Sequence, residues 1–312
     1  MKLVTFQTAG EPRQRIGAMA GDDAVCELPA EETPAFADML ALIDGGADAL
    51  AQARAALDRA GRVHALADIR LLAPLPVPRQ MRDCLSFEQH VRQVRANRHL
   101  LGIGGFPSDP AKVEIPQVWY DQPIYYKANR FSVVGPQADV VIPYGEDWFD
   151  YELEFAAVIG TGGRDLPRAG AHAHIFGYCI FNDFSARRTQ IREMAGSLGP
   201  AKGKDFDTGN VLGPWLVTAD EIADPYALTM VARVNGEEWS RGTSAAMHHR
   251  FDAILEHVSR DETIHPGEIF GSGTVGSGCG MEVGRFLKPG DVVELEVDGL
   301  GVLRNRVVAK PS

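Results

Sequence analysis

Two glutamates that alternate along one predicted strand have the clearest potential for chemistry in this sequence. Glu152 and Glu154 lie in the segment 150–155, where acidic and apolar residues alternate before an apolar run that ends at Gly160. This period predicts a strand, and side chains two residues apart on a strand share a face. Two carboxylates placed side by side raise each other's pKa unless a cation or a proton lies between them. The pattern fits a bound hard cation, and it also fits a solvated strand edge.

A histidine and a lysine elsewhere in the chain could add proton-transfer groups. His90 follows Asp83 by seven residues, a spacing that returns to the same face if the whole segment is helical. A lone histidine is more often structural or solvated than catalytic, because its own spacing demands no chemistry. Lys204 lies in a polar loop between Gly203 and Gly209, and ordinary turn chemistry alone explains such a loop.

A third set of polar residues follows a predicted buried strand at 175–181. Asp183, Arg187 and Gln190 are spaced as i, i+4 and i+7, so they line one face if a helix begins there. A carboxylate at the beginning of a helix is favourable because of the helix dipole. The alternative for Asp183 is a simple N-cap.

Two further motifs resemble known binding motifs, but we expect them to bind neither a metal ion nor a dinucleotide. His172 and His174 lie two residues apart on a predicted short helix, where they point away from each other and cannot share an ion. Residues 271–276 match GxGxxG, but glycines and a strand follow instead of a helix, so we reject a dinucleotide site. A glycine-rich turn still lets backbone N–H groups approach a ligand, and Thr274 adds a hydroxyl.

The composition excludes several classes of protein. The chain has 312 residues, of which 45% are hydrophobic, so it can form a substantial core. It has no apolar run of membrane-helix length and no signal-like N-terminus, which predicts a cytoplasmic protein without membrane contact. Its four cysteines form no CxxC pair, so we expect neither a zinc cage nor disulfides. The net charge of -11 disfavours nucleic-acid binding.

The elements that must position these residues divide into two predicted domains. Residues 1–75 read as a small sheet followed by two helices, and the prolines after them suggest a boundary. Residues 79–312 form the main domain, in which strands predominate and Asn235-Gly236 predicts a hairpin. The Gly- and Pro-rich segment 101–118 could be a lid or a binding loop. A helix is expected over 247–259, with His248 and His249 on its solvent side.

The order of these motifs resembles the fumarylacetoacetate hydrolase family, over roughly residues 79–308. The most specific part of the resemblance is the Glu-x-Glu strand followed by a strand that ends in Asn182-Asp183. The resemblance implies an α+β fold, mainly β: a mixed β-roll surrounded by short helices, with the small N-terminal α+β domain beside it. It also implies a homodimer.

The resemblance assigns roles to eleven residues. The implied metal ligands are Glu152, Glu154, Asp183 and Asp83. The implied catalytic residues are His90, Glu282, which would orient the histidine, and Lys204. The implied substrate-binding or oxyanion-stabilising residues are Tyr126, Arg187, Gln190 and Thr274. Carboxylates without Cys or His suit a hard ion, so Mg²⁺ is expected first, with Mn²⁺ or Ca²⁺ as alternatives.

These roles predict a metal-dependent hydrolase that cleaves a C–C bond in a β-diketo acid, such as an acylpyruvate or a fumarylacetoacetate-like compound. The ion would stabilise the enolate that leaves, and His90 would activate water. One alternative is a decarboxylase, isomerase or tautomerase that acts on a 2-oxo acid at the same ion. Another is a metal-stabilised binding scaffold without catalytic activity, because the family fixes the site better than the reaction.

The sequence departs from the family pattern at two positions. Some small members have a glutamate three residues after the histidine, where this chain has Gln93, so His90 must rely on Glu282 or another partner. In the polar loop that contains Lys204, Asp207 stands where the animal members of the family have a glycine. Asp150 shares the strand face of Glu152 but has no family role, and we expect it to support the site from behind or to face solvent.

Overall fold

One large sheet runs through the molecule. The computed structural model describes residues 1–59 and 61–310, and in it the sheet has the strand order β4-β3-β2-β1-β14-β12-β11-β17-β6-β7, with β5 beside β1 and β8 beside β14. Its strands are β1 (Lys2–Thr8), β2 (Arg15–Met19), β3 (Ala24–Leu28), β4 (Val63–Ala65), β5 (Ile69–Leu71), β6 (Met81–Cys84), β7 (Tyr125–Lys127), β8 (Val133–Val134), β11 (Leu153–Ile159), β12 (Ile175–Asp183), β14 (Asn210–Thr218) and β17 (Ile269–Gly271).

A second sheet packs against the first. Its order is β16-β15-β18-β19-β9, and a short pair, β10-β13, lies apart. These strands are β9 (Asp139–Val141), β10 (Phe149–Asp150), β13 (Ser185–Ala186), β15 (Thr229–Val234), β16 (Glu237–Thr243), β18 (Val292–Val297) and β19 (Gly301–Val308). The predicted hairpin is confirmed, because Asn235 and Gly236 join β15 to β16 with φ of 53° and 81°. Parallel and antiparallel pairs mix in both sheets, which confirms the expected fold class.

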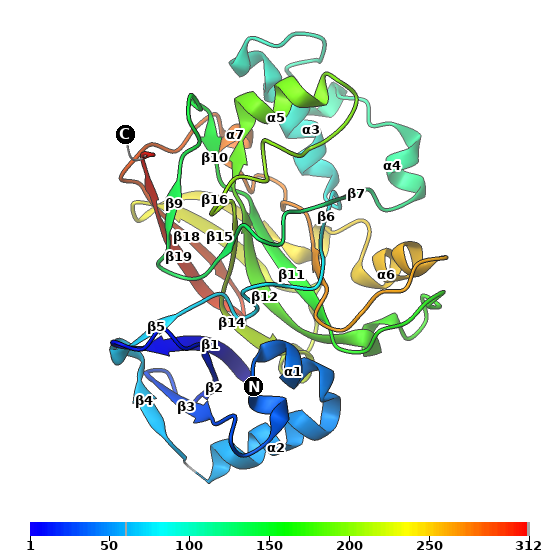
Figure 1. Ribbon diagram of the computed structural model, residues 1–312. Helices are drawn as coiled ribbons and strands as arrows, with labels where there is room; N and C mark the ends of the chain where they lie inside the picture. The colour runs from blue at the N-terminus through cyan, green and yellow to red at the C-terminus, as the bar shows by residue number, and fades with distance from the viewer. Residues whose placement is uncertain (60, 311–312) are drawn as a thin grey trace.

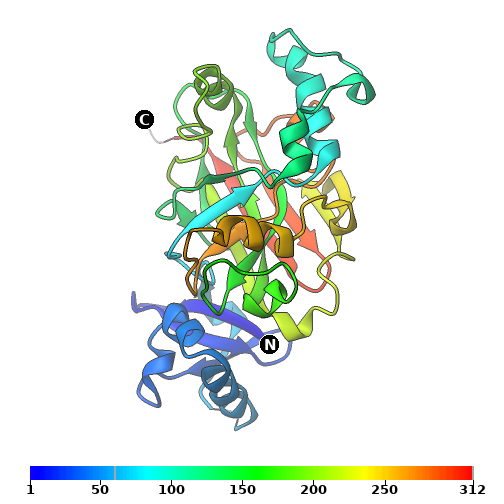
Figure 2. The same cartoon turned by 90° about the vertical axis from the view of Figure 1, so that its right-hand side faces the viewer.

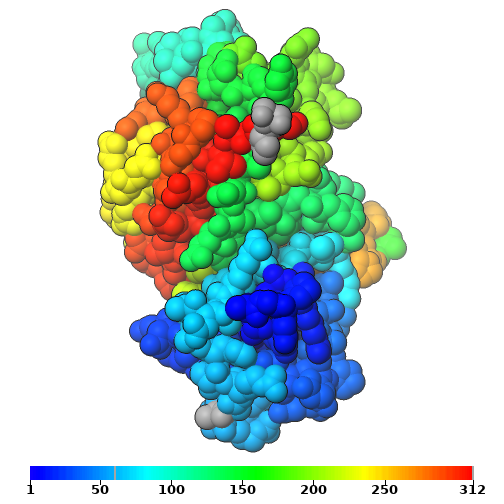
Figure 3. All heavy atoms as spheres, turned by 60° about the vertical axis from the view of Figure 1, so that its left-hand side comes forward, coloured from blue at the N-terminus to red at the C-terminus, as the bar shows by residue number. Residues whose placement is uncertain are grey.

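The N-terminal strands extend the main sheet. They form the lower part of Figure 1 together with α1 (Met39–Asp44) and α2 (Gly46–Asp58), and Figure 3 shows them as a lobe at one end of the molecule. β1 pairs with β14, with Lys2 opposite Val217, so the lobe and the rest of the chain share one sheet. The boundary between two domains after residue 75 stays a prediction.

The centre of the main sheet is buried. All seven residues of β11 and all nine of β12 are buried, because β11 lies between β12 and β17 and helices and the second sheet cover the faces. A solvated strand edge for Glu154 is therefore wrong, since this glutamate lies on a central strand. It must have partners inside the protein.

The remaining helices lie mostly at the end of the molecule opposite the N-terminal lobe (Figures 1 and 2). They are α3 (Glu88–Ala96), α4 (Gln117–Asp121), α5 (Arg187–Met194), α6 (Phe251–Ser259) and α7 (Gly280–Val283), with short 3-10 turns at Pro34–Phe36, Leu66–Asp68, Asn97–Leu101, Pro110–Lys112, Ala171–His174, Ala219–Glu221 and Ser244–Ala246. No helix in the described part of the chain is long and apolar enough to cross a membrane.

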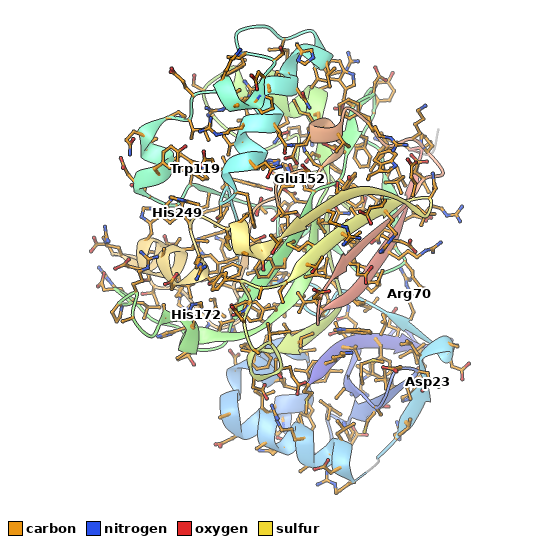
Figure 4. All side chains as sticks on the ribbon, turned by 180° about the vertical axis from the view of Figure 1, so that it is seen from behind. Asp23, Arg70, Trp119, Glu152, His172 and His249 are labelled. Carbon is orange, nitrogen blue, oxygen red and sulfur yellow. The ribbon has the colours of Figure 1, made fainter. Side chains whose placement is uncertain are left out.

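Three local predictions are wrong. Asp83 is not at the start of a helix but on strand β6, and α3 begins only at Glu88. Asp183 ends strand β12, as the family pattern implied, and lies four residues before α5 begins, so the helix face that it was expected to share with Arg187 and Gln190 does not form. His249 precedes α6 and is buried, with Nε2 2.6 Å from the carbonyl oxygen of Trp119. His248 also precedes α6 but is exposed, as expected, and stacks on the Trp119 ring. Figure 4 shows Trp119 and His249 close together.

Candidate metal centre

Four carboxylates from neighbouring strands meet inside the protein. Asp83 (β6), Glu152 (just before β11), Glu154 (β11) and Asp183 (β12) each offer an oxygen within 4.8 Å of the others, and none is more than 5% exposed. Pairing of β11 with β12 and β17, and of β17 with β6, brings three of these strands together. Figure 4 shows Glu152 from behind, in the upper half of the molecule beside α3.

Two cations contact this cluster directly. Lys204 Nζ lies 2.6 Å from Glu152 Oε2 and also contacts Asp183 Oδ2. Arg187 donates to Glu152 Oε1 at 2.7 Å and to Asp150 Oδ2 at 2.8 Å. With Asp150, five buried carboxylates face two cations, so the region needs protons or a further cation to approach neutrality.

The pKa values reflect this excess of negative charge. Burial raises the pKa of Asp83 to about 6 and that of Asp183 to about 8, against the lowering effect of Lys204. Burial, with the charge of Asp83, raises the pKa of Glu154 well above its usual range. Glu152 is the exception: burial opposes its ionisation, but Lys204 and Arg187 together hold its pKa below the ordinary value.

The cluster has the properties that a hard divalent cation requires. Asp83 Oδ1 and Asp183 Oδ1 are buried and accept no hydrogen bond from any described residue, which leaves two oxygens free for a ligand. All four donors are carboxylates, the ligand type of Mg²⁺, Mn²⁺ and Ca²⁺. The residues therefore fit a divalent ion.

Further predicted site residues bond to the cluster. The Tyr126 hydroxyl donates to Asp183 Oδ2 at 2.6 Å, and the Thr274 hydroxyl donates to Glu154 Oε1 at 3.2 Å. The Gly273 N–H donates to the other oxygen of Glu154 at 3.0 Å. These donors fix the carboxylate orientations, so the glycine-rich turn contributes backbone and hydroxyl donors to the site.

His90 and Glu282 form a second group beside the carboxylates. His90 Nδ1 lies 3.0 Å from Glu282 Oε2, and His90 Nε2 lies 4.0 Å from Glu152 Oε1. The histidine comes from the first turn of α3 and the glutamate from α7. Burial alone would lower the pKa of His90, but the charges of Glu282 and Glu152 raise it overall. The predicted pair is thus brought together, with the imidazole between Glu282 and the cluster.

Arg187 and Gln190 do meet, although Asp183 is not on their helix. Arg187 is the first residue of α5, and it donates to Gln190 Oε1 at 3.0 Å. Its other nitrogens contact Asp150 and Glu152, so the guanidinium holds Glu152 in place. Asp150 is fully buried and also accepts from the Gly280 and Met281 N–H groups, which excludes the solvent-facing alternative.

Sequence reasoning missed one residue that the cluster depends on. Gly271 ends β17 opposite Asp83, and a Cβ at this position would overlap Asp83 Oδ1 and lie 3.1 Å from Glu154 Oε2. The glycine therefore makes room for two carboxylates. The GxGxxG pattern marked the residue, but only strand pairing shows what it faces.

A cavity of about 260 Å³ opens beside these groups. Its wall includes three of the four carboxylates, together with His90, Lys204 and Gln190. The three are Asp83, Glu152 and Glu154, and the apolar side chains of the wall include Leu85, Val91, Ile124, Ile191 and Met281. Arg95 and Arg98, which lie on and just after α3, also line it. The cavity joins a polar end at the carboxylates to a largely apolar wall.

Comparison with known proteins places the chain in a family. Residues 80–308 match the family model described as the fumarylacetoacetate (FAA) hydrolase C-terminal domain. The chain belongs to the fumarylacetoacetate hydrolase family. The resemblance seen in the sequence is thereby confirmed, and the acidic cluster with His90 lies inside the matched range.

Relatives within the fumarylacetoacetate hydrolase family differ in reaction. The chain is 32% identical to a mitochondrial oxaloacetate tautomerase of Xenopus laevis over 310 residues, 99% of this chain and 90% of the relative. It is similar to the solved fumarylacetoacetate hydrolase of Exiguobacterium antarcticum, with 29% identity, a TM-score of 0.74 and coverage of 99% and 100%. A maleylpyruvate hydrolase of Sphingobium sp. SYK-6, solved with manganese(II) and pyruvate, shares the fold at 22% identity, with a TM-score of 0.76 and both chains fully covered.

Proposed function

We propose that this protein is a divalent-metal-dependent hydrolase that cleaves a C–C bond in a β-diketo acid. The observation that carries the proposal is the position of His90. Its Nδ1 lies 3.0 Å from Glu282 and its Nε2 faces Glu152 of the carboxylate cluster at 4.0 Å. A general base oriented by a carboxylate, next to a site for a hard cation, is the combination that hydrolysis of such a substrate requires.

Asp83, Glu152, Glu154 and Asp183 would hold the ion, with Mg²⁺ expected first and Mn²⁺ or Ca²⁺ as alternatives. When bound, it would supply Lewis-acid stabilisation of the negative charge that develops on the substrate oxygens. The manganese in the maleylpyruvate hydrolase structure supports a divalent ion here. Arg187 keeps Glu152 oriented through its bond at 2.7 Å.

His90 takes a proton from water, and the resulting hydroxide attacks the acyl carbonyl of the substrate. The bond between that carbonyl carbon and the neighbouring methylene breaks, the acyl part leaves as a carboxylic acid, and the methylene carbon receives a proton. Glu282 stabilises the imidazolium that forms meanwhile. Lys204 and Gln190, which line the cavity, can donate hydrogen bonds to the developing oxyanion.

The cavity favours a substrate with an extended arm and a second negative group. Arg95 and Arg98 line it, and neither forms an ion pair with a described carboxylate. Their guanidinium carbons lie 5.8 and 5.1 Å from the Phe106 ring centre, and burial lowers the pKa of both. An anionic group at the end of the arm would pair with them. This favours a fumarylacetoacetate-like compound over an acylpyruvate with a neutral chain.

A second candidate is tautomerisation of a 2-oxo acid such as oxaloacetate. The similarity to an oxaloacetate tautomerase over 99% of the chain favours it. The same His90 would then move a proton between carbon and solvent, and no C–C bond would break. Isomerisation of a 2-oxo acid, and decarboxylation, in which only the bond to a carboxylate carbon breaks, would use the same ion and are further alternatives.

A substrate panel separates these functions. Purified protein with Mg²⁺ is assayed on acetylpyruvate, fumarylacetoacetate and oxaloacetate, with product acids quantified by chromatography and enol content followed by absorbance. We expect two acids from fumarylacetoacetate. Keto-enol exchange of oxaloacetate without cleavage of any diketo acid would replace the hydrolase by the tautomerase. No turnover of any of the three substrates would contradict both and favour a metal-stabilised scaffold.

A further inference from the structure

Helix α3 carries His90 and also contacts the turn whose backbone N–H groups bind Glu282, the carboxylate beside His90. Gln93 lies one turn after the histidine and contacts Ser277, in the turn before α7. The Ser277 N–H donates to Gln93 Oε1 at 2.9 Å, and Gln93 Nε2 donates to Ser277 Oγ at 3.0 Å. Because a backbone N–H needs an acceptor, these contacts fix the orientation of the Gln93 amide.

The same turn holds Glu282 through two backbone donors. Ser277 N donates to Glu282 Oε1 at 2.8 Å, and Cys279 N donates to Glu282 Oε2 at 2.9 Å. Ser277 has a φ of 61°, in the left-handed region that a residue with a side chain enters only at a cost. Gln93 binds both the amide and the hydroxyl of Ser277, so it stabilises the conformation that points these donors at Glu282.

We infer that Gln93 is a positioning residue that holds the Ser277 turn, and through it Glu282, against His90. Because Gln93 and His90 share one helix, any shift of α3 carries the histidine and the support of its partner together. Gln93 is not among the residues that line the cavity, whereas His90 is. The inference rests on the proposed base role of His90, whose charged neighbours are Glu282, Glu152 and Arg187.

This arrangement accounts for the departure at position 93 from the small family members. In the present chain Glu282 already supplies the acid beside His90, at 3.0 Å. Gln93 and Glu282 share the Ser277 N–H, so a carboxylate at position 93 would place a like charge beside Glu282. A neutral amide accepts that N–H without repulsion and donates to the hydroxyl as well.

The test compares Gln93→Met with Gln89→Met. Methionine keeps the size of the side chain and removes its hydrogen bonds. Gln89 is the matched control, because it lies on the same helix and, among the described residues, its side chain hydrogen-bonds to the Ser277 hydroxyl at 3.1 Å but not to the Ser277 N–H. Kinetic constants are measured on the substrate that the panel identifies, Mg²⁺ affinity by calorimetry, and amide hydrogen exchange of Ser277 and Cys279 by NMR.

A general base contributes a factor of about 10² to 10⁴ to the rate. We expect kcat to fall about tenfold when Glu282 no longer lies in place beside His90. We therefore expect lower kcat, unchanged KM and Mg²⁺ affinity, and faster exchange of both amides in Gln93→Met, with little change in Gln89→Met. Unchanged exchange, an unchanged kcat or a loss confined to KM overturns the inference. If the wild type turns over no substrate, the proposed function fails, and amide exchange alone decides whether Gln93 holds the turn.

Discussion

Lys204 Nζ lies 2.6 Å from Glu152 Oε2 and also contacts Asp183, so one buried ammonium bridges two of the four clustered carboxylates. Burial would lower the pKa of Lys204, but Asp183 and Glu152 raise it. The lysine is therefore charged at neutral pH and offsets part of the repulsion in the cluster.

Replacing Lys204 by methionine should destabilise the metal-free protein strongly. Removing one partner of a buried ion pair costs about 3 to 5 kcal/mol, because the other charge is left uncompensated. Urea denaturation with EDTA should show this loss, and Mg²⁺ should reduce it by neutralising the same carboxylates. Lys202→Met, an exposed position two residues earlier, is the control. Equal stability of the two variants would contradict the bridging role.

Divalent ions should stabilise the protein. A ligand that binds only the folded state adds about 2.7 kcal/mol at a concentration one hundred times its dissociation constant. Thermal unfolding in Mg²⁺, Mn²⁺ or EDTA should show the difference as a higher Tm with metal. Glu154→Gln should reduce this increment, because it removes one charged ligand. The same Tm in EDTA and in all three metal ions would argue against a metal centre.

The metal-free protein should lose stability as the pH rises from about 5 to 8.5. The pKa of Asp83 is raised from 3.8 to about 6 and that of Asp183 to about 8, so the folded state binds more protons than the unfolded state in this window. Stability falls with pH wherever that holds. His90, whose pKa is also raised, acts in the same direction.

Denaturant titrations at several pH values in EDTA measure this slope. Asp183→Asn should flatten it, most clearly between pH 6 and 8, because the amide does not titrate. If the stability of the metal-free wild type stays level or rises with pH, other hydrogen-bond donors or cations must stabilise the ionised carboxylates.

His90→Ala should lower kcat for hydrolysis by about 10² to 10⁴, the range of a general base. Mg²⁺ affinity should stay nearly the same, because the four carboxylates are intact. Calorimetry and steady-state kinetics measure the two effects separately. His99→Ala, at an exposed histidine just after the same helix, should keep full activity. Full hydrolysis by His90→Ala would refute the base role.

Gly271→Ala should disturb the metal site, because it adds a side chain on strand β17 next to Asp83. The added Cβ would overlap Asp83 Oδ1, and overpacking of this kind costs about 1 to 3 kcal/mol. Both stability and Mg²⁺ affinity should fall, which thermal unfolding and calorimetry can measure. Gly104→Ala is the control, because a Cβ there has no neighbour within 4 Å. Unchanged metal affinity in Gly271→Ala would mean that the carboxylates can move aside.

The homodimer and the cytoplasmic location stay predictions. The Xenopus relative is named mitochondrial, which concerns that protein. The role of segment 101–118 as a lid also stays a prediction.

The sequence by itself determined the local features with strong periodicity or turn chemistry. Alternation predicted a strand at Glu152 and Glu154, and Asn235-Gly236 predicted the hairpin. The order of the motifs led to the family. These features can be predicted from the sequence because side-chain period and backbone preference are local properties.

Only the tertiary structure decided what the polar residues face. Helical spacing suggested that Asp183 shares a helix face with Arg187 and Gln190, whereas Asp183 ends a strand, as the family pattern implied. Asp83 would have shared a helix face with His90 only in a continuous helix, but it lies on a strand, because strand pairing outweighs local preference in a buried sheet. The contact of Gly271 with Asp83, and of Gln93 with Ser277, joins residues more than 180 positions apart. Such contacts have no local period in the sequence, so residues such as Gly271 and Gln93 can be assigned to the site only from the folded structure.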